Sequence, residues 1–312
     1  MDFLNSKYGK QISVFNSTLW ENRVQGPKIL EWLDNFDDDN EKDYALYILS
    51  RLMYFGSSSI RNLLKALYRD LYRYPIINTI RRNNTDTLDS NIIEGLFLQE
   101  LSATRFLGVG NPSESGVHLL YYFRQENKIP KDLFINTDDV IEYDDNGKAQ
   151  LRSSFKDVKH YVFIDDVCGS GTQATSNDSN VKRCVQHLRS IVPDARISYF
   201  MIFGLSYGIQ IVRNSGLYDY AEAVVELDDS YRCFSNQSRF FDDGDHKLTE
   251  ALQIAYKHGL KLVGHQHALG FGNCQLLLSM HHNTPDNTLP IIWFDEDNSI
   301  WKPIFKRYNK VY

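Results

Sequence analysis

The spacing of apolar residues predicts that the first third of the chain is helical. Residues 44–55 are apolar on almost every side and predict a buried helix, while residues 60–74 carry leucines along one helical face. Pro75 is expected to end the second helix, because proline lacks the backbone N–H that the next turn would use. Residues 89–105 predict a further helix.

From residue 106 onward, short apolar runs alternate with helical patterns. The runs predict strands at residues 106–109, 161–164, 197–203 and 223–227. Helices are predicted between them at residues 117–125 and 180–191. Strands that alternate with helices are typical of a parallel sheet. We therefore expect an α/β fold with a mostly parallel sheet flanked by helices in residues 106–312, preceded by a helical N-terminal region in residues 1–105.

The last part of the chain is less regular and is expected to form C-terminal additions to the α/β domain. Residues 248–258 predict a helix, and residues 274–279 and 291–294 predict short strands. The segment 282–290 is polar and contains two prolines, which favours a rigid loop.

The composition is that of a folded protein with a sizeable core. The chain has 312 residues, of which 42% are hydrophobic and 24% charged, and its net charge is −6. A net negative charge excludes general affinity for polyanions, so a nucleic acid would need a local basic patch.

Cysteine usage and the apolar stretches predict a cytoplasmic protein without a membrane partner. The four cysteines are far apart and form no CxxC pair, which indicates reduced thiols. The N-terminus lacks a signal-peptide pattern. The longest apolar stretch, residues 197–212, is interrupted by polar residues and too short to span a bilayer.

The strongest chemical signal follows the predicted strand 161–164. Asp165 and Asp166 come directly after this strand, at the sheet edge where ligands bind in open α/β folds. The glycines of the next turn, residues 168–172, let the backbone approach a ligand, and its N–H groups can hold a phosphate. Carboxylates accept hydrogen bonds from sugar hydroxyls, or hold Mg²⁺ through water. A ribose 5-phosphate group fits both features, whereas a plain Asp-Asp turn after a buried strand is the alternative.

This segment resembles the ribose-phosphate fingerprint of type I phosphoribosyltransferases. The resemblance implies that Asp165 and Asp166 are the catalytic acids that contact the ribose hydroxyls and Mg²⁺. It implies a phosphate loop made of Cys168, Gly169, Ser170, Gly171 and Thr172. The segment departs from the family pattern at Cys168, where an aliphatic residue is usual, and at Gly169. Some family members carry an Asp at the position of Gly169, where it accepts a proton from the incoming base. Gly169 has no side chain for this role, so another residue must activate the base.

A second loop has the layout and chain position of the family's pyrophosphate loop. It joins the predicted strand 106–109 to the helix 117–125. Its substrate-binding candidates are Gly110, Asn111, Ser113, Glu114, Ser115 and Gly116. Glycine-proline loops are common, so this signal is weak by itself. An acidic Glu114 facing pyrophosphate would need Mg²⁺ between them.

The resemblance extends to a subfamily and covers nearly the whole chain. Residues 50–56, 111–116, 119–125 and 283–290 resemble phosphoribosyltransferase-like effectors of bacterial conflict systems. Such proteins occur near anti-phage modules that include retron reverse transcriptases. The resemblance implies a toxin or signalling effector in antiviral defence. It would be held in check by a protein or nucleic-acid partner such as a reverse transcriptase with its msDNA.

Further polar residues are candidates for the acceptor site. They lie in the loop 282–290 and are His282, Asn283, Asp286 and Asn287. The neighbouring histidines lack the spacing of a zinc site. The tail 301–310 mixes aromatic and basic residues, which favours docking on the protein body over gripping single-stranded nucleic acid.

Three functions remain open from the sequence. The first is a glycosyltransferase that binds phosphoribosyl pyrophosphate or a nucleotide and acts at the ribose C1, with hydrolysis if water is the acceptor. The second is a non-catalytic module that senses a nucleotide and regulates a partner. The third is a nucleic-acid-docking protein.

Overall fold

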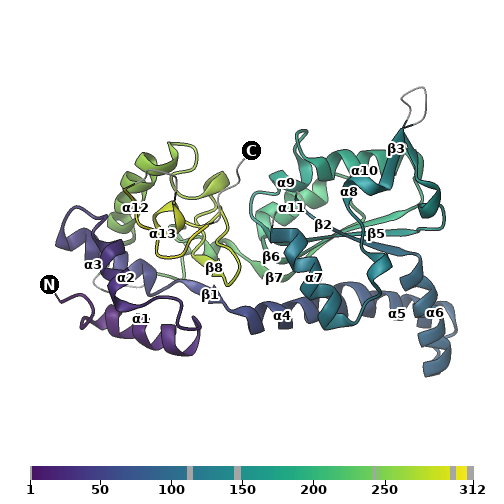
Figure 1. The fold of residues 1–312 in the computed structure, drawn as a ribbon, viewed down its shortest axis with the longest axis horizontal. Helices are drawn as coiled ribbons and strands as arrows, with labels where there is room; N and C mark the ends of the chain where they lie inside the picture. The colour runs from purple at the N-terminus through teal and green to yellow at the C-terminus, as the bar shows by residue number, and fades with distance from the viewer. Residues whose placement is uncertain are drawn as a thin grey trace. The chain divides into compact units, whose positions relative to one another are not determined.

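The computed structural model in Figure 1 describes residues 2–110, 115–143, 149–241, 244, 246–295 and 300–307, without the side chains of residues 115–118 and 143. The chain forms two compact units, one of residues 1–60 and 227–312 and one of residues 61–226. Helix α4 (Ser57–Ala66) and strand β7 (Tyr220–Leu227) each cross a boundary between the units. The units divide the chain near residues 60 and 226, whereas the boundary expected from the sequence pattern lies after residue 105.

The unit of residues 61–226 is built on a sheet of four parallel strands. Their order is β2 (Thr104–Gly108), β5 (His160–Cys168), β6 (Arg196–Leu205) and β7. In the register, Phe106 pairs with Val162 and Val162 pairs with Ser198. All residues of β6 after the first are buried, as expected for a strand covered on both faces. The predicted α/β fold with a mostly parallel sheet is confirmed.

Helices cover both faces of this sheet (Figure 1). On one face, α10 (Asn180–Ile191) and α11 (Ser206–Asn214) bury apolar side chains against Phe163 and Tyr199. On the other face, α7 (Ser115–Asn127) brings the Phe123 ring to 5.4 Å from the Phe106 ring. Residues 160–168 therefore lie between two helical layers, and any polar group on β5 needs a partner within the protein.

The other elements of this unit are shorter. They are the π-helix η1 (Leu67–Arg73), α5 (Tyr74–Asn83), α6 (Ser90–Ser102), η2 (Lys131–Leu133), α8 (Thr137–Val140), β3 (Ile141–Tyr143), β4 (Ala149–Leu151), η3 (Ser153–Phe155) and α9 (Thr172–Thr175). Strands β3 and β4 pair antiparallel, as in a hairpin. The sequence Asp144-Asp145-Asn146-Gly147, which predicts a hairpin turn, lies outside the described residues.

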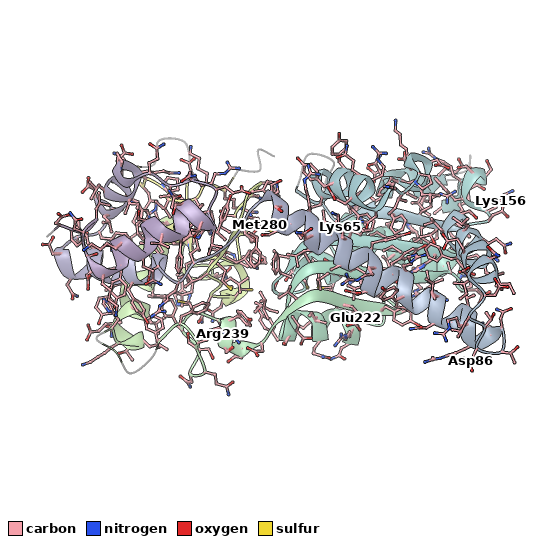
Figure 2. All side chains as sticks on the ribbon, turned by 90° about the horizontal axis from the view of Figure 1, so that it is seen from below. Lys65, Asp86, Lys156, Glu222, Arg239 and Met280 are labelled. Atoms are coloured by element: carbon pink, nitrogen blue, oxygen red, sulfur yellow. The ribbon has the colours of Figure 1, made fainter. Side chains whose placement is uncertain are left out.

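Charged pairs join the outer helices of this unit to their neighbours, and Figure 2 labels one member of each of two pairs, Lys65 and Glu222. Lys65 on α4 lies 2.9 Å from Glu126 on α7, and Arg213 on α11 lies 2.6 Å from Glu222 on β7. These side chains are partly exposed, so each pair adds little to stability, and the apolar contacts with the sheet carry the packing.

The expectation that Pro75 ends a helix was wrong. The chain passes from α4 through η1 into α5 without leaving a helical path, and the N–H of Tyr74 donates to the carbonyl of Arg69. This five-residue step is the hydrogen bond of a π-helix. Pro75 then lies in the first turn of α5, the part of a helix that best tolerates proline.

The unit of residues 1–60 and 227–312 is mainly helical and has an aromatic core. Its elements are α1 (Lys7–Thr18), α2 (Gly26–Leu33), α3 (Asp39–Leu49), β1 (Met53–Phe55), η4 (Asp229–Tyr231), α12 (Leu248–Val263), η5 (Phe271–Asn273), β8 (Leu278–Met280) and α13 (Pro290–Trp293). Trp20 and Trp32 are almost fully buried among apolar residues from both ends of the chain. The core is therefore closed by segments that are far apart in sequence.

Several predicted elements of this unit were wrong. The buried helix predicted at residues 44–55 ends at Leu49, and residues 53–55 form β1 in a parallel pair with β8. Residues 291–294, predicted as a strand, lie mostly in helix α13. Of residues 274–279, only Leu278 and Ser279 belong to a strand. Each segment is short and apolar, so its partner rather than its own pattern decides its conformation.

The C-terminal tail docks on this unit as predicted. The side chains of Trp301 and Phe305 are buried, and Phe305 meets the Trp20 ring edge-on at 5.4 Å. Residues 308–310 lie outside the described residues. The four cysteines are buried, and none of them forms a disulfide bond. In the described part of the chain, no helix combines the length and apolar character needed to cross a bilayer.

His160, the first residue of β5, is a buried titratable group at the amino end of that strand. Its Nε2 lies 2.8 Å from the Ser198 hydroxyl, and its ring stacks on Tyr72 at 5.7 Å. Its Nδ1 has no hydrogen-bond partner among the described residues. Burial, reinforced by the nearby charge of Arg196, lowers the pKa of His160 from 6.5 to about 3. His160 is therefore neutral in the folded protein at neutral pH.

Because the pKa of His160 is lowered, the folded protein should lose stability in acid. A side chain that does not titrate at this position should remove that loss. Between pH 6.5 and about 3, the unfolded chain protonates His160 and the folded protein does not, so stability falls as pH falls. His160→Gln should lower stability at pH 7.5 but remove up to about 1.4 kcal/mol per pH unit of the acid slope. Urea unfolding from pH 4.5 to 7.5 measures both effects.

The matched control for this prediction is His265→Gln, which changes an exposed histidine. We expect its stability to follow the wild-type curve at each pH. Equal acid slopes in the wild type and in His160→Gln would contradict the prediction.

Candidate functional site

Asp165 and Asp166 lie at the carboxyl end of β5, on opposite faces of the sheet. Successive residues of a strand point to opposite faces. Asp165 shares a face with Phe163, which packs in the core under α10. Asp166 shares the face of Val162, the register partner of Phe106 on the α7 side. The two carboxyl groups nevertheless remain close at the strand end, because a side-chain hydrogen bond with Asp166 contributes to the raised pKa of Asp165.

Asp165 is almost fully enclosed. It is 3% exposed, its Oδ2 accepts a hydrogen bond from the Tyr199 hydroxyl, and its Oδ1 accepts one from the Asp166 N–H at 2.9 Å. Burial raises the pKa of Asp165 well above its usual range, and the charge of Asp166 adds to this shift. Burial and the neighbouring Asp165 also raise the pKa of Tyr199. The predicted contact of Asp165 with a ribose stays a prediction.

Asp166 is half-buried and lies on the other face. Its Oδ1 accepts a hydrogen bond from the Val167 N–H at 2.8 Å, which fixes the carboxylate against its own strand. The carboxyl edge of a parallel sheet is where ligands bind in α/β proteins. Of the acid pair, Asp166 is the member that solvent reaches more easily.

The phosphate loop predicted at residues 168–172 forms a tight turn into the single-turn helix α9. Gly171 adopts a left-handed conformation with φ of 76°, which a glycine takes at no steric cost. The hydroxyls of Ser170 and Thr172 lie 2.8 Å apart, and the N–H of Thr172 donates to the Ser170 Oγ at 3.3 Å. The two hydroxyls thus converge on the exposed side of the turn. A helix of four residues has little dipole, so the loop N–H and hydroxyl groups would bind an anion.

Helix α11 packs against this loop. A methyl group on Gly208 would lie 2.1 Å from the Gly169 carbonyl oxygen, and one on Gly171 would lie 2.9 Å from the Gly208 carbonyl oxygen. Backbone therefore packs on backbone between the turn and the first turn of α11. Cys168 and Gly169 are buried in this contact region and complete the bend without offering a polar side chain to solvent.

The second predicted loop is only partly described. Strand β2 ends at Gly108, and Gly110 follows with φ of 101°. Asn111, Ser113 and Glu114 lie outside the described residues. Ser115 and Gly116 begin helix α7 on the face of the sheet that carries Asp166. Their role at a pyrophosphate stays a prediction.

The predicted acceptor-site residues belong to the other compact unit. Asp286 pairs with Arg307 at 3.0 Å, and Asn287 is buried and donates to the Phe271 carbonyl at 3.3 Å. The Asn283 carbonyl accepts from the Met280 N–H, and the His282 ring lies edge-on to that of His281 at 4.8 Å. These contacts hold the loop together, and the acceptor role stays a prediction.

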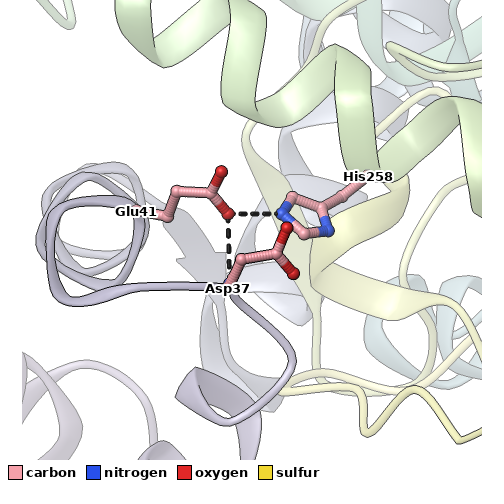
Figure 3. Close-up of side chains that lie close together, drawn as sticks. All are labelled: Asp37, Glu41 and His258. Atoms are coloured by element: carbon pink, nitrogen blue, oxygen red, sulfur yellow. Dashed lines mark hydrogen bonds and ion pairs between the residues drawn. The ribbon is translucent and has the colours of Figure 1, made fainter.

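A cluster with metal-ligand chemistry joins α3 to α12 (Figure 3). Asp37, Glu41 and His258 bring one ligand atom each within 4.8 Å of one another. The Lys257 ammonium lies 2.6 Å from Asp37 and 2.5 Å from Glu41, and the His258 Nε2 lies 2.7 Å from Glu41. A cation of the protein itself therefore already neutralises both carboxylates.

The pKa shifts support the interpretation of this cluster as a set of ion pairs that links α3 to α12. We call Asp37, Glu41, Lys257 and His258 together the clasp. Burial alone would raise the pKa of Glu41, but hydrogen bonds from Lys257 and His258 outweigh it and lower that pKa. The hydrogen bonds to Asp37 and Glu41 raise the pKa of Lys257. By its composition alone, the acidic run at residues 34–43 is typical of a solvated surface. The partner on α12 is far away in the chain, so the sequence carried no sign of it.

Tyr199 and Gly208 are the site residues that sequence reasoning missed. Tyr199 stands in an apolar run where a hydroxyl group requires a buried partner, and this requirement was the available signal. Gly208 gave no local signal, because its constraint is the close approach of the Gly169 loop.

The parallel sheet, with an acid-ended strand and a glycine and hydroxyl loop at its carboxyl edge, defines a phosphoribosyltransferase-like α/β protein. The family model described as PRTase-CE matches residues 29–307. The chain therefore belongs to the PRTase-CE family. The search of curated proteins returned no match to this sequence.

The contact between α11 and the phosphate loop predicts opposite effects of two glycine substitutions. Gly208→Ala forces its methyl group into the Gly169 carbonyl, so we expect a loss of about 1–3 kcal/mol of unfolding free energy. Gly95→Ala, in an exposed part of α6 with nothing within 4 Å of the new methyl group, should gain about 0.5–1 kcal/mol. Urea unfolding at neutral pH measures both values. Equal stabilities of the two variants would contradict the packing described for the loop.

The clasp predicts a large stability loss when one partner is neutralised. Glu41→Gln leaves the Lys257 and His258 side chains without their shared carboxylate, so we expect a loss of about 3 kcal/mol at neutral pH. Because the pKa of Glu41 is lowered, this difference should be present above pH 4.5 and shrink as the pH falls below it. Unfolding of both proteins at pH 7 and pH 3 provides the test.

A surface ion pair provides the control for the clasp. Asp70→Asn breaks a pair whose side chains are 57% and 42% exposed, so its effect should stay below about 1 kcal/mol. If the two substitutions cost the same, the acidic cluster is an ordinary surface feature.

Proposed function

We propose that the protein is a phosphoribosyltransferase-like enzyme that binds phosphoribosyl pyrophosphate, or a nucleotide with the same ribose phosphate, and acts at the ribose C1. The observation that carries the proposal is that β5 ends with Asp166 near its carboxyl end and leads directly into the turn on which the Ser170 and Thr172 hydroxyls converge. Membership of the PRTase-CE family supports the reaction class.

Different residues of the site would bind different parts of the ligand. The loop N–H groups and the two converging hydroxyls would hold the 5-phosphate, because they donate hydrogen bonds to an anion. Asp166 would accept hydrogen bonds from the ribose hydroxyls, and the loop at residues 110–116 would hold the pyrophosphate. Such placement sets the C1 atom opposite the incoming acceptor.

Mg²⁺ is proposed as the cofactor. In this structure, Asp166 is the acid of the pair that fits it, since both oxygens of Asp165 already accept hydrogen bonds inside the protein. One carboxylate together with substrate phosphates is a common Mg²⁺ site. When bound, the ion would offset the charge of the leaving pyrophosphate.

The reaction would break the bond between C1 and the pyrophosphate oxygen. The pyrophosphate leaves with the electron pair, and the acceptor forms a new bond to C1 and gives up a proton. With water as the acceptor, the products are ribose 5-phosphate and pyrophosphate. Gly169 offers no side chain as proton acceptor, so that proton must pass to another group.

We further propose that this activity serves antiviral defence in the cytoplasm, with the protein as a toxin-like effector restrained by a partner. The resemblance of residues 50–56 and 283–290 to retron-associated effectors supports this role. A reverse transcriptase with its msDNA is the partner class that this resemblance suggests.

A non-catalytic nucleotide sensor is the second candidate function. Gly169, where some family members carry a proton-accepting Asp, favours it. A sensor would bind phosphoribosyl pyrophosphate or a nucleotide without converting it. The two functions therefore differ in product formation.

The enzyme hypothesis predicts that Asp166→Asn abolishes turnover and leaves the fold intact. The substitution removes the charge that would hold the ribose and Mg²⁺ but keeps an oxygen that can accept the Val167 N–H bond. Phosphorus NMR of phosphoribosyl pyrophosphate with Mg²⁺, with water alone and then with added nucleobases and nucleotides, measures turnover. Urea unfolding measures stability, which should change little.

Asp194→Asn is the matched control, since it neutralises an exposed aspartate in the turn before β6. It should convert phosphoribosyl pyrophosphate at the wild-type rate. If Asp166→Asn turns over its substrate as fast as the wild type, the proposed enzyme is refuted. If the wild-type protein binds phosphoribosyl pyrophosphate but forms no product, the protein is a sensor. The metabolite and nucleic-acid profile of cells that express each protein then reveals the acceptor.

A further inference from the structure

We propose that the outer side of α7, together with the neighbouring side of α4, binds single-stranded nucleic acid. This surface combines two tyrosines with four cations, and we call it the α4–α7 surface. Its residues are Arg61, Lys65, Tyr121, Tyr122, Arg124 and Lys128. The proposal goes beyond the proposed function, because the reaction at the ribose C1 uses none of these side chains.

Tyr121 is an exposed aromatic side chain that its neighbours hold in place. It is 55% exposed. Its ring meets the Tyr122 ring edge-on at 5.6 Å, and its hydroxyl accepts a hydrogen bond from the Gln125 side-chain amide at 2.8 Å. An exposed ring that is already fixed loses little conformational freedom when a ligand binds. It is therefore suited to stack on a nucleic-acid base, which presents a flat face whatever its sequence.

Cations lie around the two rings. The Arg61 Cζ is 4.2 Å from the centroid of the Tyr122 ring, and the Arg124 Cζ is 5.9 Å from that of the Tyr121 ring. Lys128, directly after α7, is exposed. Aromatic rings and positive charges therefore share one surface, which is the combination that binds the bases and phosphates of a single strand.

Glu126 is the carboxylate that lies within this group. It is 2.7 Å from the Arg61 guanidinium and 2.9 Å from the Lys65 ammonium, while the Lys65 side chain is still 51% exposed. Four cations and one carboxylate leave this group with a net charge of +3, on a chain whose net charge is −6. The α4–α7 surface is thus the local basic patch that a nucleic acid needs on an acidic protein.

The C-terminal tail also mixes aromatic and basic residues, but its side chains are used inside the protein. Trp301 and Phe305 are buried, and Arg307 pairs with Asp286 at 3.0 Å. An acidic protein partner would need only the cations of the α4–α7 surface. The exposed ring of Tyr121 adds a group for stacking and favours a nucleic acid with unpaired bases.

Fluorescence anisotropy of a labelled oligothymidylate of about 15 nucleotides tests the role of the ring. Tyr121→Ala should weaken binding about 5- to 100-fold, because it removes the stacking group, whereas Tyr121→Phe keeps the ring and should bind within about twofold of the wild type. Tyr220→Ala is the matched control, since Tyr220 is 54% exposed on β7, at the sheet edge opposite β2. It should bind like the wild type. Equal affinities of the wild type and Tyr121→Ala overturn the proposal.

The salt dependence of the same binding tests the cations. Each phosphate contact to a single strand contributes about 0.7 to the slope of log affinity against log salt concentration. The double substitution Arg124→Gln and Lys128→Gln should therefore reduce this slope by up to about 1.4. The control is Lys182→Gln with Arg183→Gln on α10, which covers the other face of the sheet. A slope that Arg124→Gln with Lys128→Gln leaves unchanged contradicts the proposal.

Two further probes identify the class of ligand. A duplex of the same length has no unpaired bases and should bind more weakly than the single strand. Heparin carries negative charge without bases, so Tyr121→Ala should leave its binding unchanged. If the duplex binds as tightly as the single strand, or if Tyr121→Ala weakens heparin binding equally, stacking on unpaired bases is refuted.

These measurements contain no phosphoribosyl pyrophosphate, so they are independent of the proposed reaction. A protein that binds the oligonucleotide but converts no phosphoribosyl pyrophosphate keeps the α4–α7 surface and loses the proposed enzyme. If the wild type does not bind the oligonucleotide at low salt, the surface has no such role, and the proposed reaction is unaffected.

Discussion

The structure of the candidate site depends on the burial of β5 between two layers of helices. A strand that is covered on both faces must pair every polar atom inside the protein. β5 ends in two carboxylates, and strand geometry sends them to opposite faces. Asp165 finds Tyr199 on the neighbouring strand, and Asp166 stays at the edge. The same burial brings the turn after β5 onto α11, where glycines allow backbone to meet backbone.

The second unit is held by a different kind of interaction. Its aromatic core is assembled from both ends of the chain, and one buried carboxylate, that of Glu41, receives both the Lys257 ammonium and the His258 ring. Groups of this type can also bind a metal ion. Here the ammonium occupies the position between the carboxylates, so the cluster acts as a link between α3 and α12. The chemistry of a cluster is decided by its neighbours as much as by its own residues.

Both compact units belong to the part of the chain that the family match covers. The match to the PRTase-CE family covers residues 29–307 and therefore includes most of both units. The N-terminal helices and the segment with the loop at residues 282–290 belong to the family together with the sheet. The proposed chemistry lies in the unit of residues 61–226. The contacts of Asp286 and Asn287 show that the loop of the other unit is held by internal hydrogen bonds.

The sequence by itself determined the parallel sheet, its strands and the loop at residues 168–172. These features follow from local patterns: the apolar runs of β5 and β6, the Ser179 cap that begins α10, and the glycines that permit the tight turn. Tertiary structure alone decided that residues 53–55 pair with β8, that Pro75 continues a helical path, and that Asp165 turns toward Tyr199. Side-chain periodicity is a property of neighbouring residues, whereas pairing and burial depend on residues that only the folded chain brings together.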